Sequence, residues 1–503
     1  MTRVMQETNP RSACPEAPPP RWGRGWGEAD IWAPPPKLLA ATVMALMLPA
    51  CSLAPPYLRP ALPVAQSWPG GASAETAGAT ADKPLWSDLA WKDYFTAPEL
   101  QGLIQRALDD NRDLRMAALN IEVARASYRS AAADLLPTID ANGEGSRSLS
   151  PQSVSQSQPP RASLSRQYDA NLGVTAFELD LFGRLRSLKS SALESYLATA
   201  EARSATQIAL VAEVANAYLT LLADRKLLAL TKDTLTSRLS SLALVQRSFE
   251  HGVSSALDLA QARTAVETAR ASQAQYQRQV EQDRNALTLL VGSPVELDSL
   301  QGDLDSVRLV EDLPVGLPSQ VLLRRPDILQ AEHELQAANA NIGAARAAFF
   351  PSISLTGSAG YASQSLDKLF DANSGAWSFG PSISIPIFDA GRNQANLASA
   401  KASRDIAVAQ YEKSIQTAFR EVADGLAAKG TLTDQQKAQT DLVAATQDSY
   451  RLSQARYDHG VDSYLSVLDS QRSLFSAQQD LVSVQASRLG NLVTLYKVLG
   501  GGG

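Results

Sequence analysis

The stretches FELDLFGR (Phe177–Arg184) and IPIFDAGR (Ile385–Arg392) decide the fold, because each one opens a long helical pattern and the two lie 208 residues apart (385 minus 177). Further pairs align in the same order at this offset or at 214 (325 minus 111). They are EVANAY (Glu213–Tyr218) with EVADGL (Glu421–Leu426), the HGV sequences at His251 and His459, NRDL (Asn111–Leu114) with RPDI (Arg325–Ile328), and DLLPTI (Asp134–Ile139) with AFFPSI (Ala348–Ile353). The body of the chain is therefore two copies of one unit of roughly 200 residues.

Each copy has the same predicted layout: a helix, two strands, a very long helix and a last helix. The long helices would extend roughly 90 Å if straight. The expected helices are Glu99–Leu135, Ser187–Glu250 and Ser254–Leu290 in the first copy, and Asp327–Phe349, Asn393–Asp458 and Asp462–Leu499 in the second.

The strands are clearest in the second copy. PSISLTGSAGYAS (Pro351–Ser363) and WSFGPSISIPIF (Trp377–Phe388) alternate apolar residues with Ser, Thr and Gly. This alternation is typical of a barrel wall with lipid outside and water inside, and an ordinary half-buried hairpin has it too. In the first copy, the apolar residues from Leu172 to Ala176 are out of phase with those from Phe177 to Leu181. A bulge would reset the phase, and the sequence leaves that open.

Counting the strands predicts an oligomer. Two copies supply four strands, which cannot close a barrel, and open sheet edges are not tolerated in lipid. A dimer would give eight strands and a trimer twelve. A lumen lined by small polar residues favours the wider, trimeric barrel.

The N-terminus reads as a targeting segment. Residues 1–36 are rich in Pro, Gly and Trp without periodicity. In KLLAATVMALMLPACS (Lys37–Ser52) a basic residue precedes an apolar run that fits a signal peptide and is too short to span a bilayer, a short buried helix being the alternative. LPAC resembles the lipobox of bacterial lipoproteins, which implies acyl chains on Cys51 and, with Ser52 after it, an outer-membrane destination. The other cysteine is Cys14, so no disulfide framework holds the body together.

Composition and motifs give no sign of an enzyme. The formal net charge of −6 argues against a nucleic-acid partner. We find no nucleophile elbow, Walker loop or dinucleotide-binding turn, and no cofactor is expected. His251-Gly252 and His459-Gly460 lack a second histidine or cysteine nearby, so we expect helix bends there rather than a metal site. The third histidine, His333, is expected on a helix surface.

Several long motifs resemble the TolC-like outer-membrane efflux proteins, in particular the OprM/NodT-type lipoprotein branch. The resemblance covers essentially all of Cys51–Gly500. The motifs are FELDLFGRLRS (Phe177–Ser187), LRRPDI (Leu323–Ile328), GAARAAFFPSISLTG (Gly343–Gly357), QTAFREVADGLAAKG (Gln416–Gly430) and SYLSVLDSQRSLF (Ser463–Phe475).

The resemblance implies a mainly α protein with a membrane β-barrel part. Three chains would build a 12-stranded barrel in the outer membrane of a Gram-negative bacterium, lipid-anchored and continued into the periplasm by an α-barrel. Its partners would be a periplasmic adaptor (membrane fusion protein), an inner-membrane RND pump and outer-membrane lipid. The expected division is 1–50 extension and signal peptide, 51–98 lipidated linker, 99–312 first repeat and 313–503 second repeat.

The resemblance also implies a gate at the periplasmic tip. Leu465 and Asp469 match the family's pore constriction, and Asp258 and Tyr457 match a network that holds the tip closed. Asp462 belongs to this network and stands where some members have arginine, while Ser466 stands where some have a second carboxylate. The implied function is a passive exit duct for small molecules, with the duct of a type I protein secretion system as the alternative. A periplasmic scaffold without a pore is disfavoured by the alternating strands.

Overall fold

The computed structural model describes residues 52–69, 89–154, 162–297, 300–311 and 321–501. The chain divides into two units, Met1–Ala50 and Cys51–Gly503. The predicted extension and signal peptide (1–50) and the predicted lipidation site Cys51 lie outside the described residues. All elements named here belong to the second unit.

The expected helices and strands are present in both copies of the repeat. The helices are α2 (Trp91–Tyr94), α3 (Pro98–Asp110), α4 (Arg112–Ala133), α5 (Arg184–Glu250), α6 (Ala256–Val291), α8 (Pro326–Ala347), α9 (Arg392–Asp458) and α10 (Tyr464–Val498). The strands are β1 (Ile139–Ser150), β2 (Ser163–Leu179), β3 (Ser352–Ser363) and β4 (Gly375–Ser384). The domain boundaries inside 51–503 remain predictions.

Two predicted elements need correction. The helix expected over Glu99–Leu135 is two helices, α3 and α4, because Asn111 between them is extended at ψ 132°. The Asn111 Oδ1 accepts a hydrogen bond from the Leu114 N–H at 2.9 Å and so caps the start of α4. The strand expected to reach Phe388 ends at Ser384, two residues before Pro386, which has no N–H to donate to a ladder.

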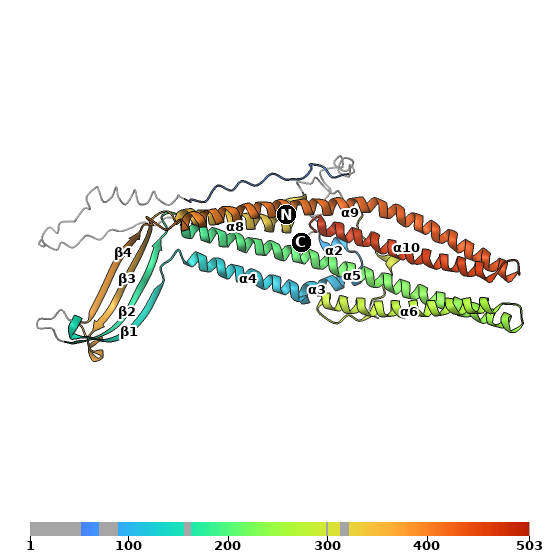
Figure 1. Ribbon diagram of the computed structural model, residues 1–503, viewed down its shortest axis with the longest axis horizontal. Coiled ribbons are helices and arrows are strands. Elements are labelled where there is room, and N and C mark those ends of the chain that lie inside the picture. Colours follow the sequence, from blue (N-terminus) through green and yellow to red (C-terminus); the bar gives the residue numbers. More distant parts are fainter. Residues whose placement is uncertain (1–51, 70–88, 155–161, 298–299, 312–320, 502–503) are drawn as a thin grey trace, which may run out of the picture. The chain divides into compact units, whose positions relative to one another are not determined.

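Helices and strands form one continuous layer (Figure 1). The sheet is antiparallel throughout, in the order β1-β2-β3-β4. Since β1 follows α4, β2 precedes α5, β3 follows α8 and β4 precedes α9, each strand continues a helix. The helices pack side by side in the matching order α4-α5-α8-α9. Farther from the sheet, α6 lies beside α5, and α10 beside α9 (Figure 1).

The main hydrophobic core lies where α2 and α3 meet the middle of the long helices. Its centre is aromatic: the rings of Tyr94 and Tyr496 stack at 4.9 Å, and the Tyr94 hydroxyl donates to the Leu492 carbonyl at 2.8 Å. Among the helices that the structure describes, one, α5, is long and apolar enough to cross a membrane, but 56% of its apolar window is buried inside the protein. We therefore interpret α5 as a core helix.

Candidate functional site

The sheet has one apolar and one polar face. Directly paired residues of neighbouring strands place their side chains on the same face. The apolar face comprises Ile139, Ala141 and Leu149 of β1, Leu164, Tyr168, Leu172, Val174, Phe177 and Leu179 of β2, Ile353, Leu355, Ala359 and Tyr361 of β3, and Trp377, Phe379 and Ile383 of β4. The polar face comprises Asp140, Asn142, Glu144, Ser146 and Ser148, then Gln167, Asp169, Asn171 and Glu178, then Ser354, Thr356 and Ser358, and Ser378 and Ser382.

A β-bulge makes the apolar face continuous. Val174 pairs with Gly357 and Phe177 pairs with Leu355, so three steps along β2 match two along β3. Within this bulge Ala176 has φ +51°, a left-handed conformation that is uncommon outside glycine. The bulge therefore returns Phe177 and Leu179 to the face that carries Leu172 and Val174. It resolves the phase conflict that the sequence left open.

The apolar face is exposed rather than packed. Trp377 is 80% and Phe379 67% exposed, and nothing in the described part of the chain covers them. Every residue of β1 and of β4 is exposed as well, and these two strands are the edges of the sheet. An apolar face opposite a polar one, on strands of this length, is the pattern of a membrane barrel wall.

At the far end from the sheet, two helix bends have the same geometry. Gly252 has φ +75° and Gly460 has φ +71°. The Gly252 N–H donates to Phe249 O and the Val253 N–H to Ser248 O, with the same pattern after α9 at Gly460 and Val461. This is a Schellman motif, in which glycine supplies the left-handed residue. His251 and His459 are the preceding C-cap residues, and both side chains are exposed.

The helices that follow the bends carry a carboxylate at different positions. Ser255 and Asp258 form a capping box at the start of α6, with the Ser255 N–H 2.9 Å from Asp258 Oδ2. In the second copy Ser466 replaces Asp258, and Asp462 accepts hydrogen bonds from the Ser463 N–H at 2.9 Å and the Ser466 hydroxyl at 3.0 Å. These bonds, foremost that from Ser463, hold the pKa of Asp462 below its usual range.

The predicted gate residues divide into two groups. Leu465 is 51% exposed, and the Asp469 carboxylate is 61% exposed and lies 3.0 Å from Arg472. Both point away from the helices on which α10 packs. Tyr457 instead packs against Tyr464, with ring centroids 5.5 Å apart. Asp258 bonds to Ser255, and Asp462 bonds to Ser463 and Ser466, so each aspartate is held within its own copy of the repeat.

A second, small hydrophobic cluster joins the two helix pairs near the tip. Val245 of α5 and Leu259 of α6 meet Tyr464 and Val467 of α10. Beside this cluster, Arg238 of α5 donates to the Ala265 carbonyl at 2.9 Å and lies 5.5 Å from the Phe475 ring of α10, and its burial lowers its pKa. Any opening of the tip that separates α10 from α5 has to break these contacts.

Two pairs of titratable residues at helix interfaces were not predicted from the sequence. His333, expected on a helix surface, is half-buried, and its Nδ1 lies 2.7 Å from Glu194 Oε2, which joins α8 to α5. The Asp224 carboxyl of α5 lies in hydrogen-bonding contact with Asp283 of α6, and burial, this bond and the charge of Asp283 raise its pKa to about 7. Each pair joins two helices, and the sequence alone does not show which helix faces meet.

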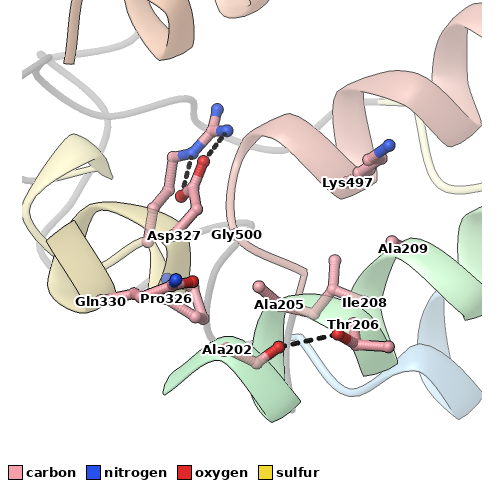
Figure 2. A pocket seen from close by; sticks show the side chains of 11 residues that line it. Ala202, Ala205, Thr206, Ile208, Ala209, Pro326, Asp327, Gln330, Lys497 and Gly500 are labelled. Atoms are coloured by element: carbon pink, nitrogen blue, oxygen red, sulfur yellow. Dashed lines mark hydrogen bonds and ion pairs between the residues drawn. The ribbon is translucent and has the colours of Figure 1, made fainter. Parts of the chain in front are cut away.

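A cavity of about 360 Å³ lies between α5, the start of α8 and the end of α10. Figure 2 shows Asp327 paired with an arginine side chain at its rim; this is Arg325, whose Nη2 lies 2.6 Å from the Asp327 carboxylate and 3.1 Å from Glu421. Ala202, Ala205 and Ile208 of α5 supply an apolar wall. The cavity offers no nucleophile beside a base, and in the described part of the chain no three His, Cys, Asp or Glu residues gather as metal ligands.

Comparison with known proteins identifies the family. The model of the "outer membrane efflux protein" family matches residues 103–293 and 317–501. The chain belongs to the outer membrane efflux protein family. The two matched ranges correspond to the two copies of the repeat, and they include both helix bends and all four strands.

Relatives and a solved structure agree with this membership. The antibiotic efflux pump outer membrane protein ArpC and the toluene efflux pump outer membrane protein TtgC, both of Pseudomonas putida, are each 53% identical over 466 residues, covering 92% of this chain and 95% of the relative. The crystal structure of the open state of the MtrE outer membrane channel of Neisseria gonorrhoeae matches with a TM-score of 0.80 and 40% identity, over 90% of this chain and 98% of that one.

This member of the outer membrane efflux protein family is thus an outer-membrane efflux channel whose helices extend into the periplasm. The sheet is its membrane part, and the bends after α5 and α9 form its periplasmic tip.

Proposed function

We propose that the protein is the passive exit duct of a tripartite RND-type efflux system, formed by three copies of the chain and gated at the periplasmic tip. The observation that carries the proposal is the layer with two open edges. In the described part of the chain no strand pairs with the outer side of β1 at one edge or with the outer side of β4 at the other. A duct follows when the β1 edge of one copy pairs with the β4 edge of the next.

Exposed apolar side chains along the helical edges support this assembly. Met116, Leu119 and Val123 of α4 are 55, 57 and 66% exposed and lie on one helical face. Ile406 of α9, on the opposite edge, is 70% exposed. Monomeric proteins rarely leave such rows open to water. Pairing the two edges would bury these apolar side chains and would pair the free backbone N–H and C=O groups of β1 and β4.

The gate is proposed at Leu465 and Asp469. Both side chains lie on the exposed face of α10 near the tip, and three copies would bring them together around one axis. A carboxylate ring favours cations. Arg472 lies 3.0 Å from Asp469 and would offset part of that charge. Asp258, Tyr457 and Asp462 are proposed to hold the tip closed, the two aspartates by fixing the first turns of α6 and α10.

Single-channel conductance in a planar bilayer tests the duct and its gate together. The native protein is expected to conduct poorly, and Leu465→Ala with Asp469→Ala is expected to conduct several-fold better, because the narrowest point loses its side chains. Leu442→Ala, at an exposed position of α9 away from the tip, serves as the matched control and is expected to conduct like the native protein. Equal conductance of all three would contradict the gate, and no conductance in any of them would contradict the duct.

Small-molecule efflux is proposed over polypeptide secretion because the relatives are named for antibiotic and toluene efflux. Expression beside an adaptor and an RND pump, in a host that lacks its own outer-membrane channel, is expected to restore resistance to both classes of compound. Restored export of a secreted polypeptide without restored resistance would favour the secretion duct.

A lipid anchor at Cys51 is supported by the residues that follow it. Arg346 near the end of α8 donates to the Leu53 carbonyl at 2.9 Å, and Asn339 donates to the Pro55 carbonyl at 2.8 Å. Residue 53 is therefore held close to the start of β3, at the membrane end of the helices. Acyl chains on Cys51 would enter the inner leaflet from there. Mass spectrometry of the mature N-terminus, with Cys51→Ser as control, tests this.

A further inference from the structure

Two arginines face each other on the apolar side of the sheet. Arg147 of β1 pairs directly with Arg166 of β2, between the pairs Gly145–Tyr168 and Leu149–Leu164 of the same face. Directly paired residues have Cβ atoms about 5 Å apart, and like charges at that distance destabilise a sheet. In the described part of the chain neither guanidinium has an acidic partner. Two like charges held together this way call for an anion from outside the protein.

The position of the pair along the strands identifies the surroundings of that anion. Tyr168, Tyr361 and Trp377 lie at neighbouring levels of the apolar face, near the end of the sheet farthest from the helices. Aromatic belts of this kind mark the headgroup level of a membrane. Arg147 and Arg166 lie one pair beyond Tyr168, about 7 Å farther out. Because the helices are periplasmic, this is the outer leaflet.

The two faces of the hairpin carry charges of opposite sign. Three residues from the arginine pair toward the helices, Glu144 pairs with Asp169 on the polar face. The Asp169 carboxylate accepts a hydrogen bond from Gln167 at 3.2 Å and faces the water-filled side. Acids therefore face the lumen and arginines face the lipid. A need for solubility alone would not sort the charges in this way.

We propose that Arg147 and Arg166 together bind a phosphate group on the headgroup of an outer-leaflet glycolipid. Arginine binds phosphate through two parallel N–H···O bonds. Two guanidiniums on adjacent strands can donate such bonds to one phosphate from opposite sides. The lipid's acyl chains would lie along the apolar face below, beside Tyr168 and Leu172. The chain would carry one such site at its β1–β2 edge, separate from the duct and the gate.

Lipid binding by the purified full-length protein in detergent tests the site. The probes are bis-phosphorylated lipid A, the same lipid after enzymatic dephosphorylation, and inorganic phosphate as competitor. The native protein is expected to bind the phosphorylated lipid about tenfold more tightly than the dephosphorylated one, the scale of one hydrogen bond to a charged group. Arg147→Gln with Arg166→Gln should lose this preference. Arg270→Gln with Arg451→Gln, which removes two exposed arginines of α6 and α9, should retain it.

Three results would overturn the proposal. They are equal binding of both lipids by the native protein, an unchanged preference in the Arg147/Arg166 variant, and displacement of the lipid by equimolar inorganic phosphate. If the double variant does not fold, the comparison of the two lipids on the native protein still decides. Arg147→Lys with Arg166→Lys keeps the charge and should keep part of the preference.

Discussion

At the scale of single residues, one glycine closes each long helical hairpin. Gly252 and Gly460 have φ near +70°, where a Cβ atom is unfavourable, and no atom lies within 4 Å of the place where a Cβ would be. Any cost of substitution at these two positions therefore comes from the backbone alone.

Gly252→Ala and Gly460→Ala are expected to destabilise the bends by about 1 kcal/mol each. Faster hydrogen exchange of the last amides of α5 and α9 measures this, because local opening depends on local stability. Gly430→Ala is the control, since Gly430 lies in the interior of α9 with open space around it. Alanine there should leave exchange unchanged or slow it, because alanine favours helix. Slower exchange in all three variants would contradict the Schellman interpretation.

Asp224 predicts a pH dependence of stability. Its pKa is raised from 3.8 to about 7 in the folded chain. Between these values the unfolded chain has released the proton and the folded chain keeps it, so stability falls as the pH rises from about 4 to about 7. Asp283, which faces Asp224 from α6, and Tyr276 nearby are the other titratable groups in this interface.

Asp224→Asn is expected to flatten this part of the pH profile, because asparagine keeps a hydrogen-bonding group and cannot ionise. The apparent Tm at intervals between pH 4 and pH 7 measures the effect. Asp441→Asn, at an exposed position of α9, is the control and should follow the native profile. Parallel profiles for the native protein and Asp224→Asn would show that this carboxyl does not govern stability in that range.

At the scale of elements, the bulge in β2 keeps the sheet amphipathic over its whole length. Deleting Ala176 removes the extra residue and shifts the alternation of β2 by one. Either the segment of β2 before the deletion or the segment after it must then turn its apolar side chains toward the polar face of the sheet. The deletion is expected to abolish assembly in the outer membrane, measured as loss of the protein from the membrane fraction.

Ala176→Gly is the matched substitution. Glycine accepts the left-handed conformation more readily than alanine, so the variant should assemble normally. Normal assembly of the deletion variant would mean that the register of β2 and β3 is not fixed by the bulge.

The sequence predicts elements well and contacts between elements poorly. Periodicity located the long helices and the strands of the second copy, because each pattern is local. The break at Asn111 was missed: asparagine is a favoured N-cap, but the helical pattern continues across it. His333–Glu194 and Asp224–Asp283 could not be predicted, since each depends on which faces of two helices meet. The gate residues came from the family resemblance rather than from any local pattern.

Ser466 shows how the two kinds of information combine. By sequence, Ser466 stands at a position where some family members have a carboxylate. In the structure its hydroxyl donates to Asp462, which stands four residues earlier. The aligned residues of the first copy are Ser254 and Asp258, so serine and aspartate have exchanged places between the copies. Both arrangements place one carboxylate at the positive end of a helix.

At the scale of the whole molecule, a single chain forms an open sheet rather than a closed barrel. Four strands and the helices that continue them form one layer with two open edges, and the chain contains no element that covers either edge in its described part. Three copies joined edge to edge would complete a twelve-stranded barrel and a helical tube beneath it.

A disulfide scan across the β1 and β4 edges tests this claim most directly. One cysteine replaces Asn142 of β1 and a second is moved along β4 through Ala376, Ser378, Gly380 and Ser382, all of which share the polar face with Asn142. Within one chain β1 and β4 are three strand spacings apart, about 14 Å, which is beyond disulfide reach, so any new bond joins two copies. Oxidised bands of two and three chains, and none larger, are expected for one register of the scan and not for the parent protein. Single chains at every position, or a ladder that continues past three, would contradict it.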